Sequence, residues 1–450
     1  MGFGQKYQRY IARLILIDYG SNEWKGSFQY EAEYANLYFL RLLALKTPTT
    51  EAAHRKWIQP DQASSLSASS SDSTTTGPIM FAPKVTNIVP GQRCAVVGTV
   101  YCDKAHKPNV LDDLSQELWL MAPPARDSYC SPDDAYYLED ESSRITLTGE
   151  IVRSASLVTG AVVAVLGMEN LAGEFEVQDL CFPGLAPQPS ALPELAEDQY
   201  VALVSGLNLA EGNPVSLPME MLAEYLAGHL GAEGDQEINS SIVRLVILGN
   251  SLNSTTSLTE KCQSLFLNGL SPLENLDTLL SDFCSAMPTT IQPGERDPVN
   301  HVVPQQPLHT SLFPQASKLS SFQSVSNPSW INVGDISSSG QTISDACKYT
   351  ESTSALEMAE LTLRWRHIAP SAPDTLWCYP FVDNDPFVLK STPHLYCIGN
   401  QSEFDSKLIK GSEGQVCRIV CVPDFSKTQT IVLINLRNLA THPISFAVNF

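Results

Sequence analysis

The proline-rich stretch 183–193 (PGLAPQPSALP) divides the chain into two parts with different patterns. Before it, several apolar or alternating runs interrupted by glycine predict short strands. After it, predicted strands alternate with predicted helices, which is typical of an α/β layered domain. Prolines clustered between two such parts indicate a domain boundary. We therefore expect a multi-domain α+β protein within the 450 residues.

The first part is predicted to contain a helix and a small β-barrel. Residues 28–46 (FQYEAEYANLYFLRLLALK) predict a helix that Ser27 caps and that Lys46 and Pro48 end. Apolar side chains lie on nearly every face of this helix, so we expect it to be buried on more than one side. Strands are predicted at 94–101, 144–152, 157–166 and 174–182, the last two as a hairpin. Several strands with glycine kinks favour a Greek-key barrel of the OB-fold type, with a β-sandwich as the alternative.

The predicted domain boundaries follow from these patterns. Residues 1–27 show no clear pattern and are predicted to be an N-terminal extension. Residues 28–185 are the predicted helix and barrel domain, and its Ser/Thr-rich insert 62–77 is predicted to be disordered. Residues 186–450 are the predicted α/β domain. Its strands are expected at 200–204, 243–248, 394–398, 416–422 and 430–436, and its helices from Pro218 toward Gly231, within 258–287 with breaks at Gly269 and Pro272, and at 356–367.

Charge and cysteine usage narrow the class of protein. The chain has 49 acidic and 28 basic residues and a formal net charge of -21. Because non-specific binding of nucleic acid relies on Lys and Arg, a protein that grips DNA over its whole surface is excluded. No apolar run of 18 residues and no secretion signal are found, so we expect neither a membrane span nor export. The 11 cysteines include no CxxC pair, which favours buried, reduced thiols in an intracellular protein.

Four polar, glycine-bearing loops follow predicted strands of the second part, where an α/β domain places its sites. They are 205–208 (SGLN), 249–253 (GNSLN), 293–297 (PGERD) and 399–401 (GNQ). Their order and spacing resemble the motif series of calcineurin-like metallophosphoesterases. That family carries Asp-x-His, then Gly-Asp-x-x-Asp, then Gly-Asn-His-Asp/Glu, and finally Gly-His-x-His.

The residues that would bind two metal ions are replaced in these loops. Two divalent cations need carboxylates to offset their charge and imidazoles to complete their coordination. Only Asp297 keeps the expected type; the replaced positions are Ser205 and Leu207, Asn250 and Asn253, Glu295 and Arg296, and Asn400 and Ser402. We therefore expect no metal, no other cofactor and no catalysis. An active metal-dependent phosphodiesterase is the alternative.

Several blocks of the second part resemble the small (B) subunits of DNA polymerase delta. They include 293–298 (PGERDP), 303–309 (VPQQPLH), 363–381 (LRWRHIAPSAPDTLWCYPF), 385–387 (DPF) and 422–425 (VPDF). The resemblance extends from Phe28 to the C-terminus and leaves out the Ser-rich insert. It implies an OB-fold followed by an inactivated phosphoesterase-like domain. It also implies a nuclear scaffold for DNA replication and repair that holds the C-terminal region of the catalytic subunit and a further accessory subunit.

Aromatic residues on a proline-rich loop are candidates for partner contact. Trp377, Tyr379 and Phe381 lie among the four prolines between 370 and 386, and Phe387 follows directly. Such residues either anchor a partner or pack into the domain core, and the sequence leaves both open. The strands of the barrel offer mainly Val, Ile, Thr and Glu, whereas single-strand binding needs aromatic stacking on a basic groove. We therefore expect DNA contact to be indirect or weak, with a single-strand DNA-binding OB protein as a further alternative.

Overall fold

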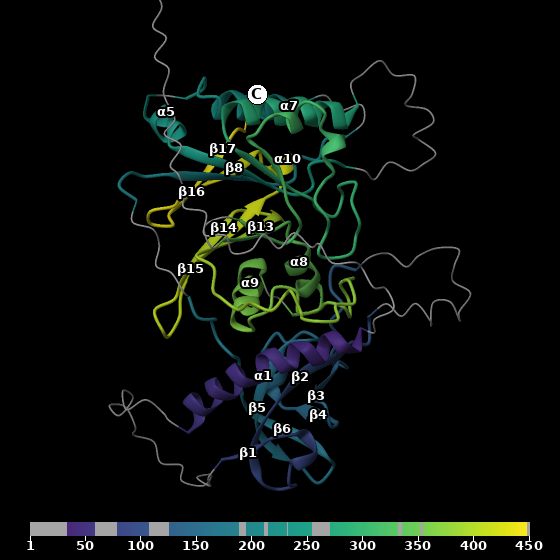
Figure 1. Cartoon of the computed structure of the whole chain (residues 1–450). Coiled ribbons are helices and arrows are strands. Elements are labelled where there is room, and N and C mark those ends of the chain that lie inside the picture. The colour runs from purple at the N-terminus through teal and green to yellow at the C-terminus, as the bar shows by residue number, and fades with distance from the viewer. Residues whose placement is uncertain are drawn as a thin grey trace, which may run out of the picture. The chain divides into compact units, whose positions relative to one another are not determined.

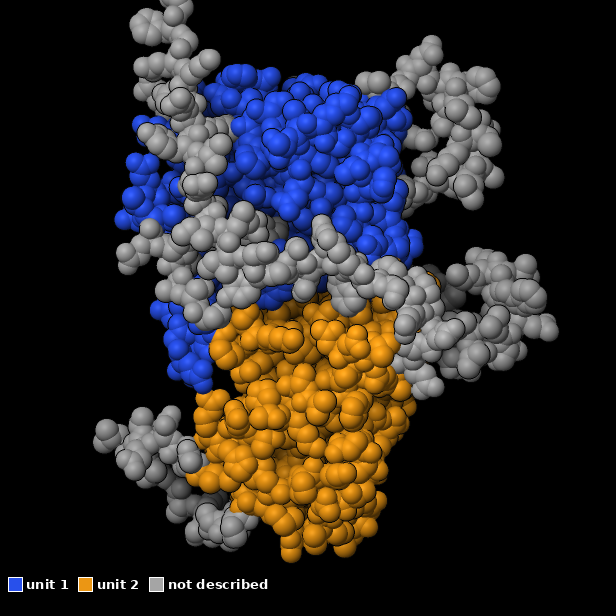
Figure 2. All heavy atoms as spheres, viewed as in Figure 1, with its two compact units in different colours: residues 1–27, 188–341, 393–450 blue, residues 28–187, 342–392 orange. Residues whose placement is uncertain are grey.

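The computed structural model describes residues 34–58, 79–107, 126–188, 195–210, 215–231, 233–253, 271–331, 335–351 and 354–447. These residues form two compact units (Figures 1 and 2). Unit 1 comprises the described residues within 188–341 and 393–450, and unit 2 comprises those within 28–187 and 342–392. Each unit is thus assembled from segments far apart in the sequence. The division at residue 186 stays a prediction, and the insert 62–77 lies outside the described residues.

Unit 2 contains a closed β-barrel. Its strands are β2 (Arg93–Asp103), β3 (Ala135–Glu139), β4 (Arg144–Thr148), β5 (Val162–Glu169) and β6 (Glu174–Cys181). β2 pairs with both β3 and β5, and β4 pairs with β6 in parallel, which closes the order β2-β3-β4-β6-β5. The short β1 (Met80–Ala82) pairs in parallel with β2, and the 3-10 helix η2 (Val85–Asn87) follows β1. The closure confirms the predicted barrel over a sandwich, and β5 and β6 form the predicted hairpin.

One predicted strand of the barrel is too long. The alternation at 144–152 predicted one strand, but β4 ends at Thr148 and the helix α3 (Glu150–Ser154) follows. Between them Gly149 has a φ of 118°, a conformation that favours glycine and turns the chain. Val152 is buried in the barrel core from this helix and not from a strand.

The helix α1 (Ala35–Trp57) packs against the barrel of unit 2 (Figure 1). Its Leu42, Leu45 and Ala53 contact a cluster that includes Val97 and Val162 from β2 and β5. The prediction that Pro48 ends this helix was wrong, because the buried turn around Ala53 stabilises a continuation to Trp57. Beside the proline, the hydroxyls of Thr49 and Thr50 donate to the carbonyls of Leu45 and Lys46. The predicted residues 28–33 lie outside the described part of the chain.

A buried polar cluster joins α1 to the segment that follows α8 (Gln341–Lys348) and α9 (Ala355–Arg364). Arg41 Nε lies 2.8 Å from Asp385 Oδ2, and His367 Nε2 lies 2.8 Å from the same oxygen. The remaining guanidinium nitrogens donate to the carbonyls of Gly160, Pro370 and Ala372. Burial alone would raise the pKa of Asp385, but the adjacent His367 and Arg41 hold it well below its usual range. Burial, together with Arg41, lowers the pKa of His367 to about 4.

Unit 1 contains two β-sheets whose facing sides share a hydrophobic cluster. One sheet has the order β10-β9-β8-β7-β16-β17 and the other β11-β12-β13-β15-β14. Their strands are β7 (Tyr200–Val204), β8 (Ile242–Leu248), β9 (Thr289–Gln292), β10 (Phe322–Ser324), β11 (Ser329–Ile331), β12 (Asp335–Ser338), β13 (Leu395–Gln401), β14 (Asp405–Lys410), β15 (Val416–Pro423), β16 (Thr430–Asn435) and β17 (Thr441–Ser445). The shared cluster includes Leu203 and Val246 from the first sheet and Leu395 and Val420 from the second.

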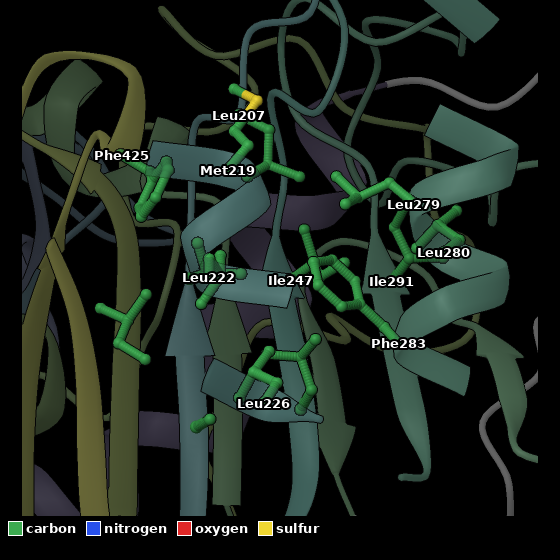
Figure 3. Packing of buried hydrophobic residues seen from close by; sticks show 14 of the residues in the cluster. Leu207, Met219, Leu222, Leu226, Ile247, Leu279, Leu280, Phe283, Ile291 and Phe425 are labelled. Atoms are coloured by element: carbon green, nitrogen blue, oxygen red, sulfur yellow. The ribbon is translucent and has the colours of Figure 1, made fainter. Parts of the chain in front are cut away.

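The other face of the first sheet is covered by helices. Alternate residues of β7 and β8, such as Ala202 and Ile247, join a cluster with side chains of α4 (Leu217–Leu226) and α7 (Pro272–Ala286) (Figure 3). Pro218 occupies the first turn of α4 as predicted, and Ser271 forms a capping box at the start of α7. The short helices are α5 (Glu233–Ser240), α10 (Phe425–Thr428), η3 (Thr310–Leu312) and η4 (Ala316–Lys318). None of the helices in the described ranges combines the length and hydropathy needed to cross a membrane.

Candidate functional site

The predicted loops of unit 1 meet where the strands β7, β8, β9 and β13 end. Gly206 N donates to Gly249 O at 3.0 Å, and Asn208 N donates to Asn250 O at 3.0 Å. These contacts bring the first loop beside the second. The third and fourth loops join them through Asn250 and Asn400, as described below.

The first loop offers no metal ligand. Ser205 is buried, and its Oγ donates toward Pro423 O at 2.9 Å while accepting from Asn400 N at 2.9 Å. Leu207 lies wholly in the hydrophobic cluster between the sheet and its helices (Figure 3). With a buried leucine and a hydroxyl engaged with backbone atoms, this loop is part of the protein's core.

The second and third loops are tied to each other by hydrogen bonds. Asn250 Oδ1 accepts from Arg296 N at 3.1 Å, and Arg296 Nη1 donates to Asn208 Oδ1 at 3.2 Å. Asn253 takes part through its backbone N, which donates to Leu209 O at 2.9 Å. Glu295 is exposed to solvent beside them. The amide oxygen of Asn250 is therefore already used within the protein.

Asp297 is the one carboxylate of the motif series, and backbone N–H groups surround it. Its oxygens accept from Leu252 N at 2.8 Å and from Gly294 N at 2.7 Å. Burial raises the pKa of Asp297 to about 6, although these N–H groups act in the opposite direction. The carboxylate thus fastens two loops together and does not point at an open site.

The fourth loop is bound into the same network. Asn400 Nδ2 donates to Leu248 O at 3.0 Å and to Ser339 O at 2.8 Å, so both of its N–H groups are engaged by backbone carbonyls. Its Oδ1 is buried without a partner. Ser402, the second predicted position, is exposed to solvent beyond the loop. The structure therefore brings Asn400 into the network but leaves Ser402 outside it.

Three buried amides that the sequence reasoning did not single out complete the network. Asn327 Oδ1 accepts from Gln292 Nε2 at 3.0 Å, and Asn327 Nδ2 donates to Gln305 Oε1 at 2.8 Å and to Ser339 Oγ at 2.6 Å. Gln305 Nε2 donates in turn to Gly294 O at 3.1 Å. Gln305 follows Pro304 within the block 303–309, and Asn327 precedes Pro328; a neighbouring proline was the only signal available.

Glycines let the loops touch directly. A Cβ atom at Gly249 would lie 2.7 Å from Ser339 Cβ and 2.8 Å from Gly294 Cα. A Cβ atom at Gly399 would lie 2.5 Å from Leu248 O. The loops are thus in van der Waals contact where two metal ions would need space, and their side chains are mostly neutral donors. This set of residues does not fit a two-metal centre, and no group of three or more His, Cys, Asp and Glu in the described part of the chain is placed to hold a metal ion.

The aromatic candidates for partner contact lie in unit 2 and differ in exposure. The side chain of Trp377 is 70% exposed, and Tyr379 is half-buried. Phe381 and Phe387 are buried with their ring centroids 6.0 Å apart. The two phenylalanines therefore pack in the core of unit 2, and partner contact stays a prediction for Trp377 and Tyr379.

Comparison with known proteins defines the class to which these two units belong. The family model for the DNA polymerase delta subunit OB-fold domain matches residues 33–180, and the family model for the B subunit of DNA polymerase alpha/epsilon matches residues 201–406. The chain thus has the two domains of a small, or B-type, DNA polymerase subunit.

Curated relatives narrow the class to one polymerase. The chain is 40% identical to the DNA polymerase delta small subunit of Arabidopsis thaliana, with 96% of each chain covered. It is 40% identical to that of Oryza sativa over 80% of this chain and 85% of the relative, and 33% identical to that of Saccharomyces cerevisiae over 93% and 90%. The chain therefore belongs to the family of DNA polymerase delta small subunits, which are accessory subunits of that polymerase.

Proposed function

We propose that this chain is a non-catalytic scaffold of DNA polymerase delta, acting in the nucleus in DNA replication and repair synthesis. The observation that carries the proposal is the hydrogen-bonded network of loops in unit 1. Its neutral amides, the buried Leu207 and the enclosed Asp297 are poor substitutes for the ligands of a phosphoesterase. We regard unit 1 as an inactivated phosphoesterase-like domain whose former site now stabilises the fold.

The partners follow from this role. A small subunit of a polymerase acts together with a catalytic subunit, and we propose that this chain holds the C-terminal region of that subunit and a further small accessory subunit. The net charge of -21 suits basic partner surfaces, because complementary potentials favour association. The same charge opposes direct binding to phosphates, so contact with DNA runs through the partners.

Co-expression tests the scaffold. The chain is produced with a full-length delta-type catalytic subunit, or with one lacking its C-terminal region, and each mixture is separated by size-exclusion chromatography. We expect co-elution at one to one with the full-length subunit and separate elution with the truncated one. Separate elution in both cases would refute the scaffold role for the catalytic subunit.

A metal titration tests the absence of catalysis independently. Isothermal titration of Mn²⁺ into the purified chain is expected to show no stoichiometric binding, and the chain is expected not to hydrolyse bis-p-nitrophenyl phosphate. Two bound Mn²⁺ ions per chain together with hydrolysis would instead establish an active metal-dependent phosphodiesterase.

A further inference from the structure

The helix α1 exposes an apolar surface that unit 2 does not cover. Apolar side chains lie on nearly every face of this helix, and its buried face includes Leu37, Leu42 and Leu45. On another face, Phe39 is 53% exposed and Leu43 is 65% exposed. Side chains four residues apart are neighbours on a helix surface, so these two form a continuous apolar area.

A neighbouring loop extends this area. Asn36 Nδ2 donates to Val382 O at 3.0 Å, and Asn36 is one turn before Phe39 on α1. Val382 is itself 47% exposed. We call Phe39, Leu43 and Val382 the α1 strip. Single exposed apolar residues are ordinary on a protein surface, whereas several together indicate an interaction site.

The α1 strip lies on a rigid base. Arg41, which lies between Phe39 and Leu43 in the sequence, holds α1 through Asp385 and three backbone carbonyls. Near the other end of the helix, Lys56 Nζ and Trp57 Nε1 each lie 2.8 Å from a carboxylate oxygen of Asp179. A surface that is already ordered loses little conformational freedom when a partner binds. The α1 strip is therefore held in place by contacts within unit 2.

We infer that the α1 strip docks the catalytic subunit through an apolar segment that carries a basic side chain. The inference rests on the proposed function and assigns it a surface. The catalytic subunit is chosen as the partner because a small subunit of a polymerase, by definition, works together with a catalytic subunit. The basic side chain is inferred from Asp383, which follows Val382, is exposed, and forms no ion pair within the described ranges.

The test compares binding of matched variants to the full-length catalytic subunit. The double variant Phe39→Gln/Leu43→Gln removes the apolar side chains and keeps good helix formers. The control Leu171→Gln changes a leucine that is fully exposed in the turn between β5 and β6 of the same unit. Biolayer interferometry is expected to show at least tenfold weaker binding for the double variant, which corresponds to about 1.4 kcal/mol, and no change for the control. Melting temperatures of both variants should match the wild type because the replaced side chains are exposed.

A charge variant examines the same surface without altering its apolar side chains. Asp383→Lys is expected to weaken binding and to reduce its dependence on salt, since a complementary pair becomes a repulsive one.

The outcomes separate the inference from the proposed function. If the wild type binds and the double variant binds within twofold of it, the docking inference is wrong and the scaffold role stands. If the double variant instead loses only a different subunit, the assignment to the catalytic subunit is also wrong. If the wild type itself does not bind the catalytic subunit, both proposals fail.

Discussion

Replacing Arg41 by methionine is expected to destabilise unit 2 by about 3–5 kcal/mol, the usual cost of removing one partner of a buried ion pair. Both side chains of the Arg41–Asp385 pair are inaccessible to solvent. Without the guanidinium, Asp385 keeps hydrogen bonds from His367 and Phe387 N but loses its charged partner. The carbonyls of Gly160, Pro370 and Ala372 lose their donors as well. Because an unsatisfied buried polar group costs about 1–3 kcal/mol, the upper part of the range is the more fitting estimate.

Urea unfolding followed by circular dichroism gives the change in the free energy of unfolding. Since two compact units need not unfold together, hydrogen exchange of α1 peptides is measured alongside to localise the effect. Arg153→Met serves as the control, because Arg153 is an exposed arginine of α3 in the same unit. We expect the control to stay within about 0.5 kcal/mol of the wild type.

A double-mutant cycle with Asp385→Asn completes the measurement. A coupling energy of about 1 kcal/mol or more between Arg41 and Asp385 is expected for two groups in one buried network. A loss below about 1 kcal/mol in Arg41→Met, with unchanged exchange in α1, would show that the cluster does not fasten the helix.

Three further changes address the buried polar groups. Asn327→Leu should destabilise unit 1 by about 3 kcal/mol or more, because it removes the partners of Gln292, Gln305 and Ser339; a loss under about 1 kcal/mol in urea unfolding would contradict this. The pKa of His367 lies at about 4, below its ordinary value, so its contribution to stability is present above about pH 6.5 and lost as the pH falls toward 4. When the pH is lowered from 7 to 4, the free energy of unfolding of His367→Gln should therefore fall by about 3 kcal/mol less than that of the wild type. Parallel curves of unfolding free energy against pH would refute the lowered pKa of His367. Asp297 has a pKa raised to about 6, so its contribution is lost as the pH rises through 6. Between pH 4 and pH 7, the free energy of unfolding of Asp297→Asn should therefore rise by about 3 kcal/mol relative to that of the wild type in the same assay.

Local patterns predicted the strands that carry apolar runs. β7, β8, β15 and β16 were predicted nearly to the residue, because most residues on both faces of these strands are buried and their sequences are apolar apart from a few positions such as Arg244 and Arg418. β9 was missed because its four residues, TTIQ, are mostly polar although all are buried. β17 was missed because it contains Pro443 and lies at the edge of its sheet.

The sequence predicted which loops lie at the candidate site but not the hydrogen bonds that these loops make. Motif order identified the four loops that the structure brings together, whereas the interpretation of Asn250 and Asn400 as replaced metal ligands stays a prediction. The partners that these loops use instead, such as Ser339 and Asn327, lie in other segments and are brought close only by tertiary packing. Sequence spacing carries no signal for such contacts.

The separation of Arg41 from Asp385 has a consequence for synthesis of the chain. The two residues are 344 positions apart. At about 5–20 residues per second, a ribosome needs roughly 17–70 seconds to add the second after the first. During that interval α1 carries a charged side chain whose binding site on the 366–387 segment does not yet exist. A chain that ends anywhere before Asp385 therefore lacks part of unit 2, although the barrel of that unit was synthesised first. Such an incomplete subunit is exposed to cellular quality control.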